Sequence, residues 1–414
     1  MQQLEKKLNL LYGSIHGTYW IQYGILCSFS SVFLLARGYS NSQIGVILAA
    51  GNILAVLGQP FLADLADRSR KITIYHMMAG MVVLLMALCA LLYVLKEPNL
   101  LTAVIYVLAY AWMMILQPFC NAANRNLEET GIFINFGACR SVGSFCYAVV
   151  MLFLGSLVLT FGVDSIQLVG EVALLALLLI ILVTGRAKNR AMADLAAAGI
   201  QAPAMRAARD AQEEEEEIDL KAFFGRHRMF MVVCIGVLGV YFTNSTLNTY
   251  MAQIVDNVGG NSADTGRIFS LLAFMEIPTL VLFERLHRKF SCAAMLKFSA
   301  VAFVLWVSIC LIARNVGTIL AAQLVQPFSF ALFLPAMVRF IDDTMSKGEA
   351  IKGQTMFTTM TTMAAIFASL AGGVILDHSG PKVLLLVSTI LTVAGTVIVF
   401  LSVDRAGREG KPLH

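Results

Sequence analysis

Long apolar segments, each of about 20 residues and separated by short charged turns, follow one another along almost the whole of this 414-residue chain. A helix of about 20 residues crosses the ~30 Å hydrocarbon core of a bilayer, so each segment predicts a membrane-spanning helix. Strands of a membrane barrel would instead be alternating segments of about ten residues. The sequence predicts twelve spans, at residues 11–36, 43–64, 72–95, 100–124, 132–158, 165–185, 229–254, 266–285, 292–313, 316–341, 353–376 and 382–403.

The composition excludes the common soluble classes. Hydrophobic residues make up 58% of the chain and charged residues 14%, whereas soluble domains contain about 25% charged residues. A cytosolic enzyme, a nucleic-acid binder and a secreted disulfide scaffold are therefore not expected. All eight cysteines fall in apolar spans without metal or redox spacing, so we interpret them as packing residues. We expect an all-α membrane protein without a cofactor or a metal site.

The predicted spans form two groups of six. We assign residues 1–185 to an N-terminal six-helix bundle, 229–403 to a C-terminal six-helix bundle and 404–414 to a tail. The hydrophilic stretch 186–228 between the bundles contains the acidic run Glu213 to Glu217. We interpret it as a solvated linker or, alternatively, as a docking site for a regulator.

The positive charges predict the orientation. Most of the 30 Lys and Arg residues lie in segments on the side of the N-terminus, and positive charge favours the cytoplasmic side of a membrane. Both termini and the linker are therefore expected in the cytoplasm. We expect a multi-pass monomer of the cell membrane, in contact with the lipid bilayer.

The two halves resemble each other. Gln117-Pro118-Phe119 in span four recurs as Gln326-Pro327-Phe328 in span ten, and Asn41-Ser42 before span two recurs as Asn261-Ser262 before span eight. Such an internal repeat predicts two similar bundles around an axis along the membrane normal. The substrate site is then expected where they meet, near mid-membrane.

Two charged residues lie deep in predicted spans, where charge is costly and indicates function. Arg140 in span five offers five hydrogen-bond donors for a hydroxyl pair or a carboxylate. Glu276 in span eight can accept hydrogen bonds from a polar solute, and it can carry a proton. The alternative for each is a structural partner that ties helices together.

Aromatic and polar side chains at helical spacing add candidates for solute binding. His16, Tyr19, Trp20 and Tyr23 share one face of span one, which suits a sugar ring or a nucleobase but also a packing stripe, and His16 is either a proton carrier or a buried structural histidine. Further polar candidates must face another helix or a wet cavity. They are Tyr241, Asn244 and Asn248 in span seven, Asn121 in span four and Gln326 in span ten.

The loop at residues 63–71 carries mixed charges, Asp67, Arg68, Arg70 and Lys71. These can pair across the cytoplasmic helix ends and hold the outward-open state. A plain stop-transfer cluster would explain the basic residues but not Asp67.

This loop resembles the signature loop of the major facilitator superfamily, with Ala63 where the family prefers Gly. The chain looks most like the branch of lactose permease and nucleoside permease, the oligosaccharide:proton symporters. Phe136-Gly137-x-x-Arg140-x-x-Gly143 is similar to the motif whose Arg contacts the sugar in that branch. The resemblance also places Tyr147 where a ring stacks on the sugar. Met275-Glu276-Ile277-Pro278 resembles the motif whose acid takes part in proton coupling.

The departures from that branch limit what is carried over. Asn121 occupies the position where lactose permease has a carboxylate. Gln326 and Ser329 occupy the positions of its span-ten His and Glu. Lactose is therefore not expected as the solute. Proton coupling would rest on Glu276, with His16, and facilitated diffusion is the alternative.

We therefore expect a secondary transporter that moves a small polar solute, a sugar, glycoside or nucleoside, inward with protons by alternating access. One alternative is a drug or metabolite exporter of the same fold. The other is a non-transporting sensor that binds solute and signals through 186–228. A membrane enzyme is not expected, because no nucleophile–base pair, metal motif or phosphate-binding loop is visible.

Overall fold

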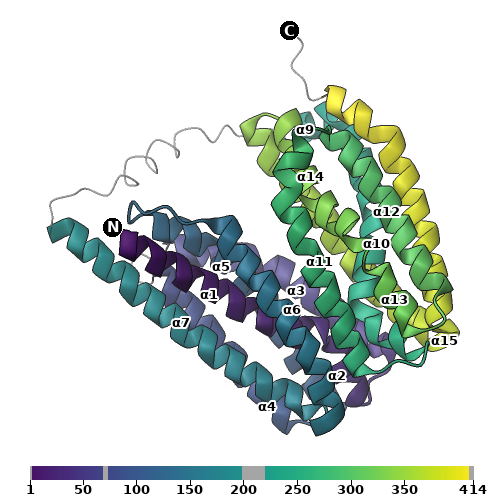
Figure 1. The fold of residues 1–414 in the computed structure, drawn as a ribbon, viewed down its shortest axis with the longest axis horizontal. Coiled ribbons are helices and arrows are strands. Elements are labelled where there is room, and N and C mark those ends of the chain that lie inside the picture. Colours follow the sequence, from purple (N-terminus) through teal and green to yellow (C-terminus); the bar gives the residue numbers. More distant parts are fainter. Residues whose placement is uncertain (1, 69–72, 198–219, 410–414) are drawn as a thin grey trace. The chain divides into compact units, whose positions relative to one another are not determined.

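The computed structural model describes residues 2–68, 73–197 and 220–409, and every regular element within them is a helix. The chain divides into two compact units (Figure 1). The first contains Met1–Tyr39 and Ala50–Glu214, and the second contains Ser40–Ala49 and Glu215–His414. Each unit is described by itself.

The first unit contains the N-terminal helices. They are α1 (Gln2–Tyr23), a π-helix (Gly24–Ser28), α2 (Ser30–Ala36), α3 (Asn41–Arg68) from Ala50 onward, α4 (Ile74–Val94), α5 (Leu100–Glu128), α6 (Phe136–Phe161) and α7 (Asp164–Ala197). Helix α1 packs against α6 and α7, and α4 packs against α5 and α7 (Figure 1). Candidate solute-binding residues of α1 and α6 therefore lie on neighbouring helices.

The second unit contains the C-terminal helices. They are α9 (Leu220–Arg226), α10 (Arg228–Asp256), α11 (Ser262–His287), α12 (Cys292–Ile312), α13 (Val316–Ala322), a 3₁₀ turn (Gln326–Phe328), α14 (Phe330–Thr344) and α15 (Lys347–Glu409). Glycines let α10 approach α15: a Cβ added to Gly395 would lie 2.5 Å from the carbonyl oxygen of Gly236. Small residues at a crossing bring helix backbones close together in membrane proteins.

The predicted spans correspond to these helices. Among the described residues, ten helices are long and apolar enough to cross a membrane, or eleven if α1 and α2, bent by 45°, form one span. Helix α15 has 63 residues, or ~95 Å at 1.5 Å per residue, about three times the bilayer core. Its backbone is non-helical at Gly380, between predicted spans 353–376 and 382–403. The count of twelve therefore depends on dividing α15 there.

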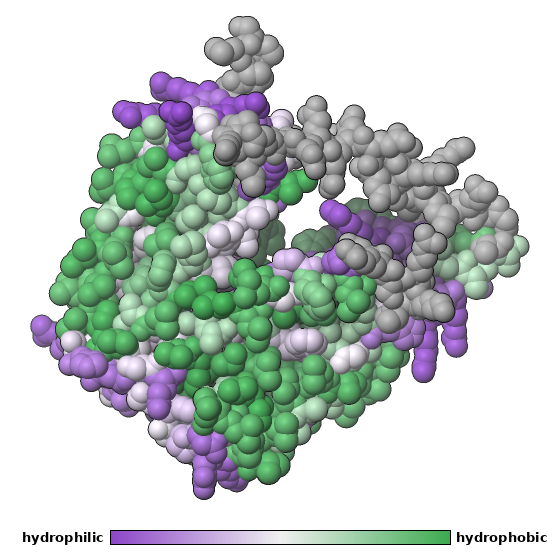
Figure 2. Space-filling view, turned by 180° about the vertical axis from the view of Figure 1, so that it is seen from behind, coloured by the Kyte–Doolittle hydropathy of each residue, from purple (hydrophilic) through white to green (hydrophobic). Residues whose placement is uncertain are grey.

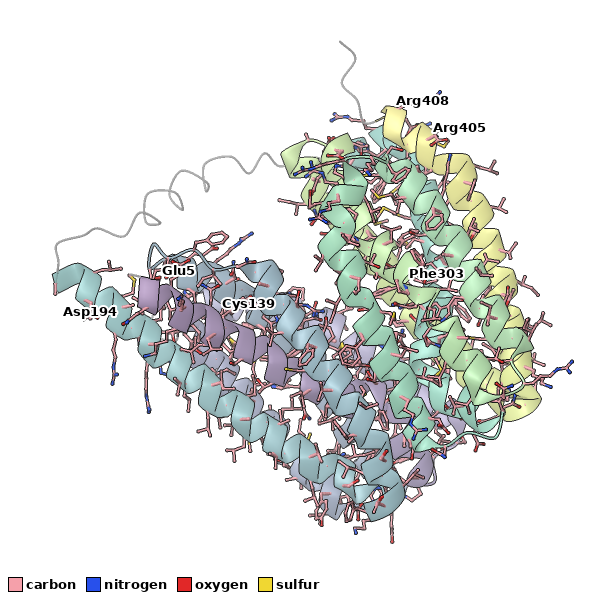
Figure 3. All side chains as sticks on the ribbon, viewed as in Figure 1. Glu5, Cys139, Asp194, Phe303, Arg405 and Arg408 are labelled. Atoms are coloured by element: carbon pink, nitrogen blue, oxygen red, sulfur yellow. The ribbon has the colours of Figure 1, made fainter. Side chains whose placement is uncertain are left out.

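The outer sides of the helices are apolar, as a bilayer requires. Many large hydrophobic side chains are exposed, among them Leu57, Phe61, Leu100 and Phe161, each at 70% or more. Figure 2 shows broad hydrophobic areas on the surface, with hydrophilic residues gathered at their margins. The labelled charges of Figure 3 also lie near helix ends: Glu5, Asp194, Arg405 and Arg408. These surfaces fit contact with lipid along the spans and with water beyond them.

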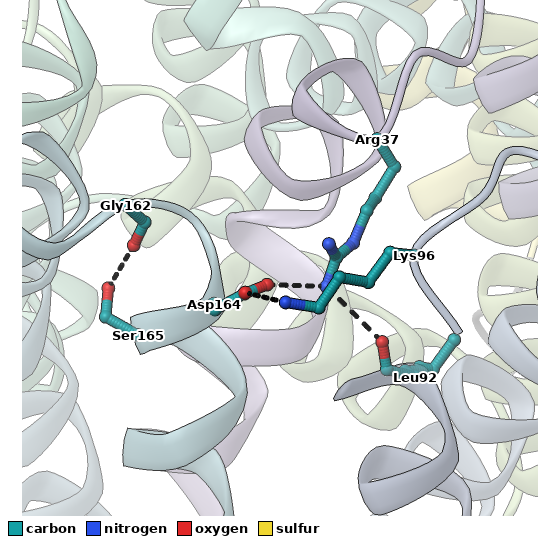
Figure 4. A network of polar contacts seen from close by, with 6 residues as sticks. All are labelled: Arg37, Leu92, Lys96, Gly162, Asp164 and Ser165. Carbon is teal, nitrogen blue, oxygen red and sulfur yellow. Dashed lines mark hydrogen bonds and ion pairs between the residues drawn. The ribbon is translucent and has the colours of Figure 1, made fainter. Parts of the chain in front are cut away.

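A salt bridge joins three segments at one end of the first unit. Asp164, the first residue of α7, contacts Nη2 of Arg37 and Nζ of Lys96, each at 2.7 Å. Arg37 Nη2 also donates a hydrogen bond to the carbonyl of Leu92 (Figure 4). The carboxylate thus connects the ends of α2, α4 and α7.

The first turn of α3 belongs to the second unit, where Asp377 of α15 binds it. The Asp377 carboxylate accepts hydrogen bonds from the backbone N–H groups of Asn41 and Ser42, at 3.0 and 2.8 Å, and from Nδ2 of Asn41 at 2.9 Å. The first N–H groups of a helix lack partners within the helix, and a negative charge is favourable there. Asp377 therefore caps α3 from another helix.

The predicted linker 186–228 is partly helical. Helix α7 continues as far as Ala197, and α9 occupies Leu220–Arg226. Arg226 Nη1 lies 2.5 Å from Oε1 of Glu349 in α15. The acidic run from Glu213 to Glu217 lies outside the described residues, so the linker interpretation stays a prediction.

Candidate functional site

Arg140 lies against an aromatic ring of α1. It stands near the start of α6, and its Cζ is 3.9 Å from the centre of the Trp20 ring. Its Nη1 donates a hydrogen bond of 3.2 Å to Ser144 Oγ, one turn further along α6. A guanidinium over an indole face is a favourable cation–π contact. The Arg140 side chain is half-buried.

Gly143 allows this contact. A Cβ added to Gly143 would lie 2.5 Å from Cδ1 of Trp20 and 3.2 Å from the carbonyl oxygen of His16. Any larger residue would therefore push Trp20 out of its place. The first glycine of the motif is different, because a Cβ at Gly137 would meet only the Asn135 side chain, at 3.8 Å.

The aromatic residues of α1 divide into two kinds. The Trp20 ring centre lies 4.8 Å from that of Tyr23 and 5.6 Å from that of Tyr19. Tyr19 is fully buried, and its hydroxyl donates to the carbonyl of Met113 at 3.1 Å. Trp20 and Tyr23 are half-buried. Tyr19 thus supports the cluster, while Trp20 and Tyr23 have ring surface that is not covered.

Tyr147 packs where α1 passes into the π-helix. Its hydroxyl is 2.8 Å from Ser28 Oγ, and a Cβ added to Gly24 would lie 3.1 Å from its ring. Only 8% of Tyr147 is exposed. A π-bulge changes the direction of a helix, and here the bent segment is adjacent to a predicted site residue. The sequence pattern indicates neither Ser28 as the partner of Tyr147 nor Ser144 as the partner of Arg140.

His16 and Asn121 lie in different surroundings. His16 is buried, with ring centres of Tyr12 and Phe136 at 4.8 and 5.9 Å. Neither of its ring nitrogens has a hydrogen-bond partner among the described residues. Asn121 of α5 is exposed, and its carbonyl lies 3.5 Å from the Tyr12 hydroxyl. Among the described residues, His16 therefore packs against aromatic rings, and its ring nitrogens take part in no chain of hydrogen bonds.

In the second unit, Glu276 is bound by Gln326. Nε2 of Gln326 donates a hydrogen bond of 2.6 Å to Oε1 of Glu276 in α11. Gln326 is only 1% exposed, whereas Glu276 is half-buried. Oε1 of Gln326 has no hydrogen-bond partner among the described residues. The pair thus combines an ionisable group with a buried amide that has an unused acceptor.

A break in the helix positions Gln326. Helix α13 ends at Ala322 and α14 begins at Phe330, and the 3₁₀ turn that contains Gln326 lies between them. Pro327 has no N–H to continue the helical ladder, and Ser329 Oγ donates to the Gln326 carbonyl at 2.9 Å. In the first unit, α5 instead continues through Pro118. The repeated sequence therefore adopts two conformations.

The residues predicted to form a polar face on span seven lie in two different environments. The Tyr241 ring is surrounded by four phenylalanine rings with centres 5.7 to 6.1 Å away, and it is 4% exposed. Those rings belong to Phe303, labelled in Figure 3, and to Phe330, Phe333 and Phe357. Asn244 and Asn248 are half-buried, and Asn248 Nδ2 donates to the Asn244 carbonyl at 2.8 Å. Tyr241 thus packs in the core.

The predicted cytoplasmic loop is described only in part. Asp67 and Arg68 are the last residues of α3. Arg70 and Lys71 lie outside the described residues, so the role assigned to the four charges stays a prediction.

Comparisons with known proteins place this chain among membrane transporters. A family profile described as "MFS_1 like family" matches residues 12–387. The maltose permease of Geobacillus stearothermophilus is 23% identical over 393 residues, covering 94% of this chain and 93% of that protein. An uncharacterized transporter of Bacillus subtilis, YwbF, is 22% identical over 398 residues, covering 93% of this chain and 91% of that protein.

Solved structures share the fold. The nucleoside transporter NupG aligns with a TM-score of 0.72 at 14% identity, covering 96% of this chain and 98% of that one. A D-xylose-proton symporter aligns with a TM-score of 0.66 at 14% identity, covering 98% of each chain. These likenesses confirm the all-helical transporter fold expected from the sequence.

Proposed function

The chain belongs to the MFS_1 like family of major facilitator transporters, and from this premise we propose that it takes up a small polar solute with protons by alternating access. The solute class is a sugar, glycoside or nucleoside. Similar proteins are described as a maltose permease, a nucleoside transporter and a D-xylose-proton symporter. Their names support this class, and the side chains of the first unit support it independently.

The observation that carries the proposal is the contact between Arg140 and Trp20. Sugars and nucleosides have flat, weakly polar ring faces and rims of hydroxyl groups. The half-buried rings of Trp20 and Tyr23 offer surfaces for stacking, and the guanidinium, held at 3.9 Å from Trp20, offers several donors on one plane. One cluster can therefore bind both parts of such a solute.

Glu276 is proposed as the proton-carrying group. A half-buried carboxylate in a span can gain or lose a proton as its surroundings change. Gln326 Nε2 donates a hydrogen bond to Oε1 of Glu276, and we propose that the solute and the proton compete for this carboxylate. Solute binding and proton binding would then be coupled.

The other candidate residues receive supporting roles. Tyr19, Tyr147 and Tyr241 are buried and are proposed to fix the shape of the site, while His16 is retained as a second proton candidate. Asn121, Asn244 and Asn248 are proposed as solute contacts, because each is at least partly accessible.

The orientation and assembly are part of the same proposal. We place both termini in the cytoplasm on the distribution of basic residues, and we propose that the transporter acts as a monomer. Cytoplasmic termini would be protected from protease added to sealed right-side-out vesicles, and cleavage of either terminus there would contradict the orientation.

The experiment is uptake into proteoliposomes with an imposed proton gradient. Radiolabelled sugars and nucleosides are first screened for gradient-driven accumulation, and unlabelled compounds then compete with the best one. We expect accumulation that collapses with a protonophore. Uptake that ignores the gradient would overturn proton coupling, and normal uptake by both Arg140→Ala and Glu276→Gln would overturn the site. Arg314→Ala is the matched control, because Arg314 lies in a loop and belongs to neither the Arg140–Trp20 pair nor the Glu276–Gln326 pair.

A further inference from the structure

Three side chains of different chemistry meet at one end of the second unit. His287 is the last residue of α11, Cys292 is the first residue of α12, and Asp343 lies near the end of α14. Cys292 Sγ is 3.5 Å from Nδ1 of His287 and 3.7 Å from Oδ2 of Asp343. Nε2 of His287 is 3.9 Å from the same Oδ2. Imidazole, thiol and carboxylate thus face one another.

We propose that His287, Cys292 and Asp343 form a binding site for a divalent transition metal of the zinc type. Zinc takes cysteine sulfur at ~2.3 Å and histidine nitrogen at ~2.0 Å in tetrahedral geometry, which puts the two donor atoms about 3.5 Å apart. The sulfur-to-nitrogen distance here is 3.5 Å and the sulfur-to-oxygen distance is 3.7 Å. A ligand atom from each of the three residues lies within 4.8 Å of the others, so one ion can reach all three.

Neighbouring side chains hold two of the donors in place. Arg339 Nε contacts Oδ1 of Asp343 at 3.1 Å, which leaves Oδ2 directed at Cys292 and His287. The Phe283 ring lies parallel to the His287 ring, with centres 6.2 Å apart and planes 6° apart. Groups that orient metal ligands in this way contribute to affinity.

The site is accessible from one side. Cys292 is 7% exposed, while the side chains of His287 and Asp343 are 22% and 40% exposed. An ion can therefore enter past the carboxylate, and water can fill a fourth position. Metal binding releases the thiol proton to solvent, and the thiolate and the carboxylate then balance the two charges of the ion.

Metal binding would join three helices. The ligands come from the ends of α11, α12 and α14, so a bound ion would link these three helix ends. An ion that binds only the folded chain raises the temperature of unfolding. The proposal does not depend on the transported solute.

The experiment is a cobalt titration of the full-length protein in detergent, without a polyhistidine tag. Cobalt(II) is a spectroscopic substitute for zinc and absorbs characteristically when tetrahedral and bound to thiolate. We expect one equivalent to bind, with a thiolate-to-cobalt absorption band that zinc removes by competition. Cys292→Ser should abolish that band, and His287→Ala or Asp343→Asn should weaken binding at least ~10-fold.

Control variants separate this site from other thiols and imidazoles. Cys310→Ser removes another buried cysteine of α12, and His378→Ala removes an exposed histidine distant in sequence from these ligands. Both should bind cobalt as the wild type does. Each variant is checked for a single gel-filtration peak. No stoichiometric cobalt spectrum, or a thiolate band that persists in Cys292→Ser, would overturn the proposal.

A second readout is thermal. Equimolar zinc should raise the unfolding temperature of the wild type and of Cys310→Ser but leave that of Cys292→Ser unchanged. An equal rise in all three proteins would mean that zinc stabilises the chain elsewhere, and it would also overturn the assignment.

Discussion

Gln326 Nε2 donates a hydrogen bond of 2.6 Å to Oε1 of Glu276, and this bond joins α11 to the broken helix of residues 316–344. If Glu276 carries the coupled proton, Glu276→Gln imitates its protonated form and cannot cycle. We expect Glu276→Gln to lose gradient-driven accumulation while it retains exchange of labelled for unlabelled solute. Both are measured in proteoliposomes. Glu171→Gln, a carboxylate of α7, is the control and should accumulate normally. Accumulation by Glu276→Gln would contradict the role.

The fluorescence of Trp20 can report on solute binding next to Arg140. The chain has three tryptophans, and Trp306 is fully buried in the second unit. A solute that stacks on Trp20 should change the emission of that ring, so Trp20→Phe should abolish the solute-induced fluorescence change and Trp306→Phe should retain it. A titration with the accumulated solute tests this. An equal change in both variants would argue against stacking.

The two glycines of the α6 motif form a matched pair. A methyl group at Gly143 would lie 2.5 Å from Trp20 Cδ1, whereas at Gly137 its nearest neighbour is 3.8 Å away. Gly143→Ala should displace Trp20 from Arg140 and raise the KM for solute about 10-fold, the loss of ~1.4 kcal/mol of binding. Gly137→Ala should transport as the wild type does. Equal KM values for both variants would show that the ring position does not matter.

The helices could be predicted from the sequence because a lipid-facing helix must be apolar along its whole length. The predicted span 292–313 and the observed helix Cys292–Ile312 nearly coincide. The break at Gln326 could not be predicted in the same way. Pro118 and Pro327 occur in the same tripeptide, but only the second interrupts its helix. The side chains packed around each tripeptide decide between the two conformations, and the sequence pattern does not show which side chains those are.

Individual contacts were less predictable than helices. Helical spacing put Tyr19 and Trp20 in the same stripe, but Tyr19 is buried and its hydroxyl donates a hydrogen bond to the carbonyl of Met113 in α5, whereas Trp20 is half-buried. The cluster of His287, Cys292 and Asp343 joins residues that are up to 56 positions apart, and no short spacing rule indicates it. Long-range contacts of this kind require the fold.

The bridge at Asp164 predicts unequal effects on stability. Arg37 is 6% exposed and Lys96 58% exposed as side chains. Asp164→Asn leaves the buried guanidinium without its counter-ion and should cost about 2–3 kcal/mol of unfolding free energy, because an unpaired buried charge is costly. Lys96→Met removes an exposed partner and should cost less than ~1 kcal/mol. Thermal unfolding in detergent measures both, and equal losses would contradict the burial argument.

Asp377 predicts a local change at the start of α3. Its carboxylate accepts hydrogen bonds from the backbone N–H groups of Asn41 and Ser42, and loss of a helix cap costs about 1 kcal/mol. Asp377→Ala should therefore speed hydrogen–deuterium exchange in the peptide that begins α3. Peptides of α12 should exchange as before, and His378→Ala, its exposed neighbour, should change neither. Unchanged exchange at Asn41 and Ser42 in Asp377→Ala would show that other contacts hold this turn.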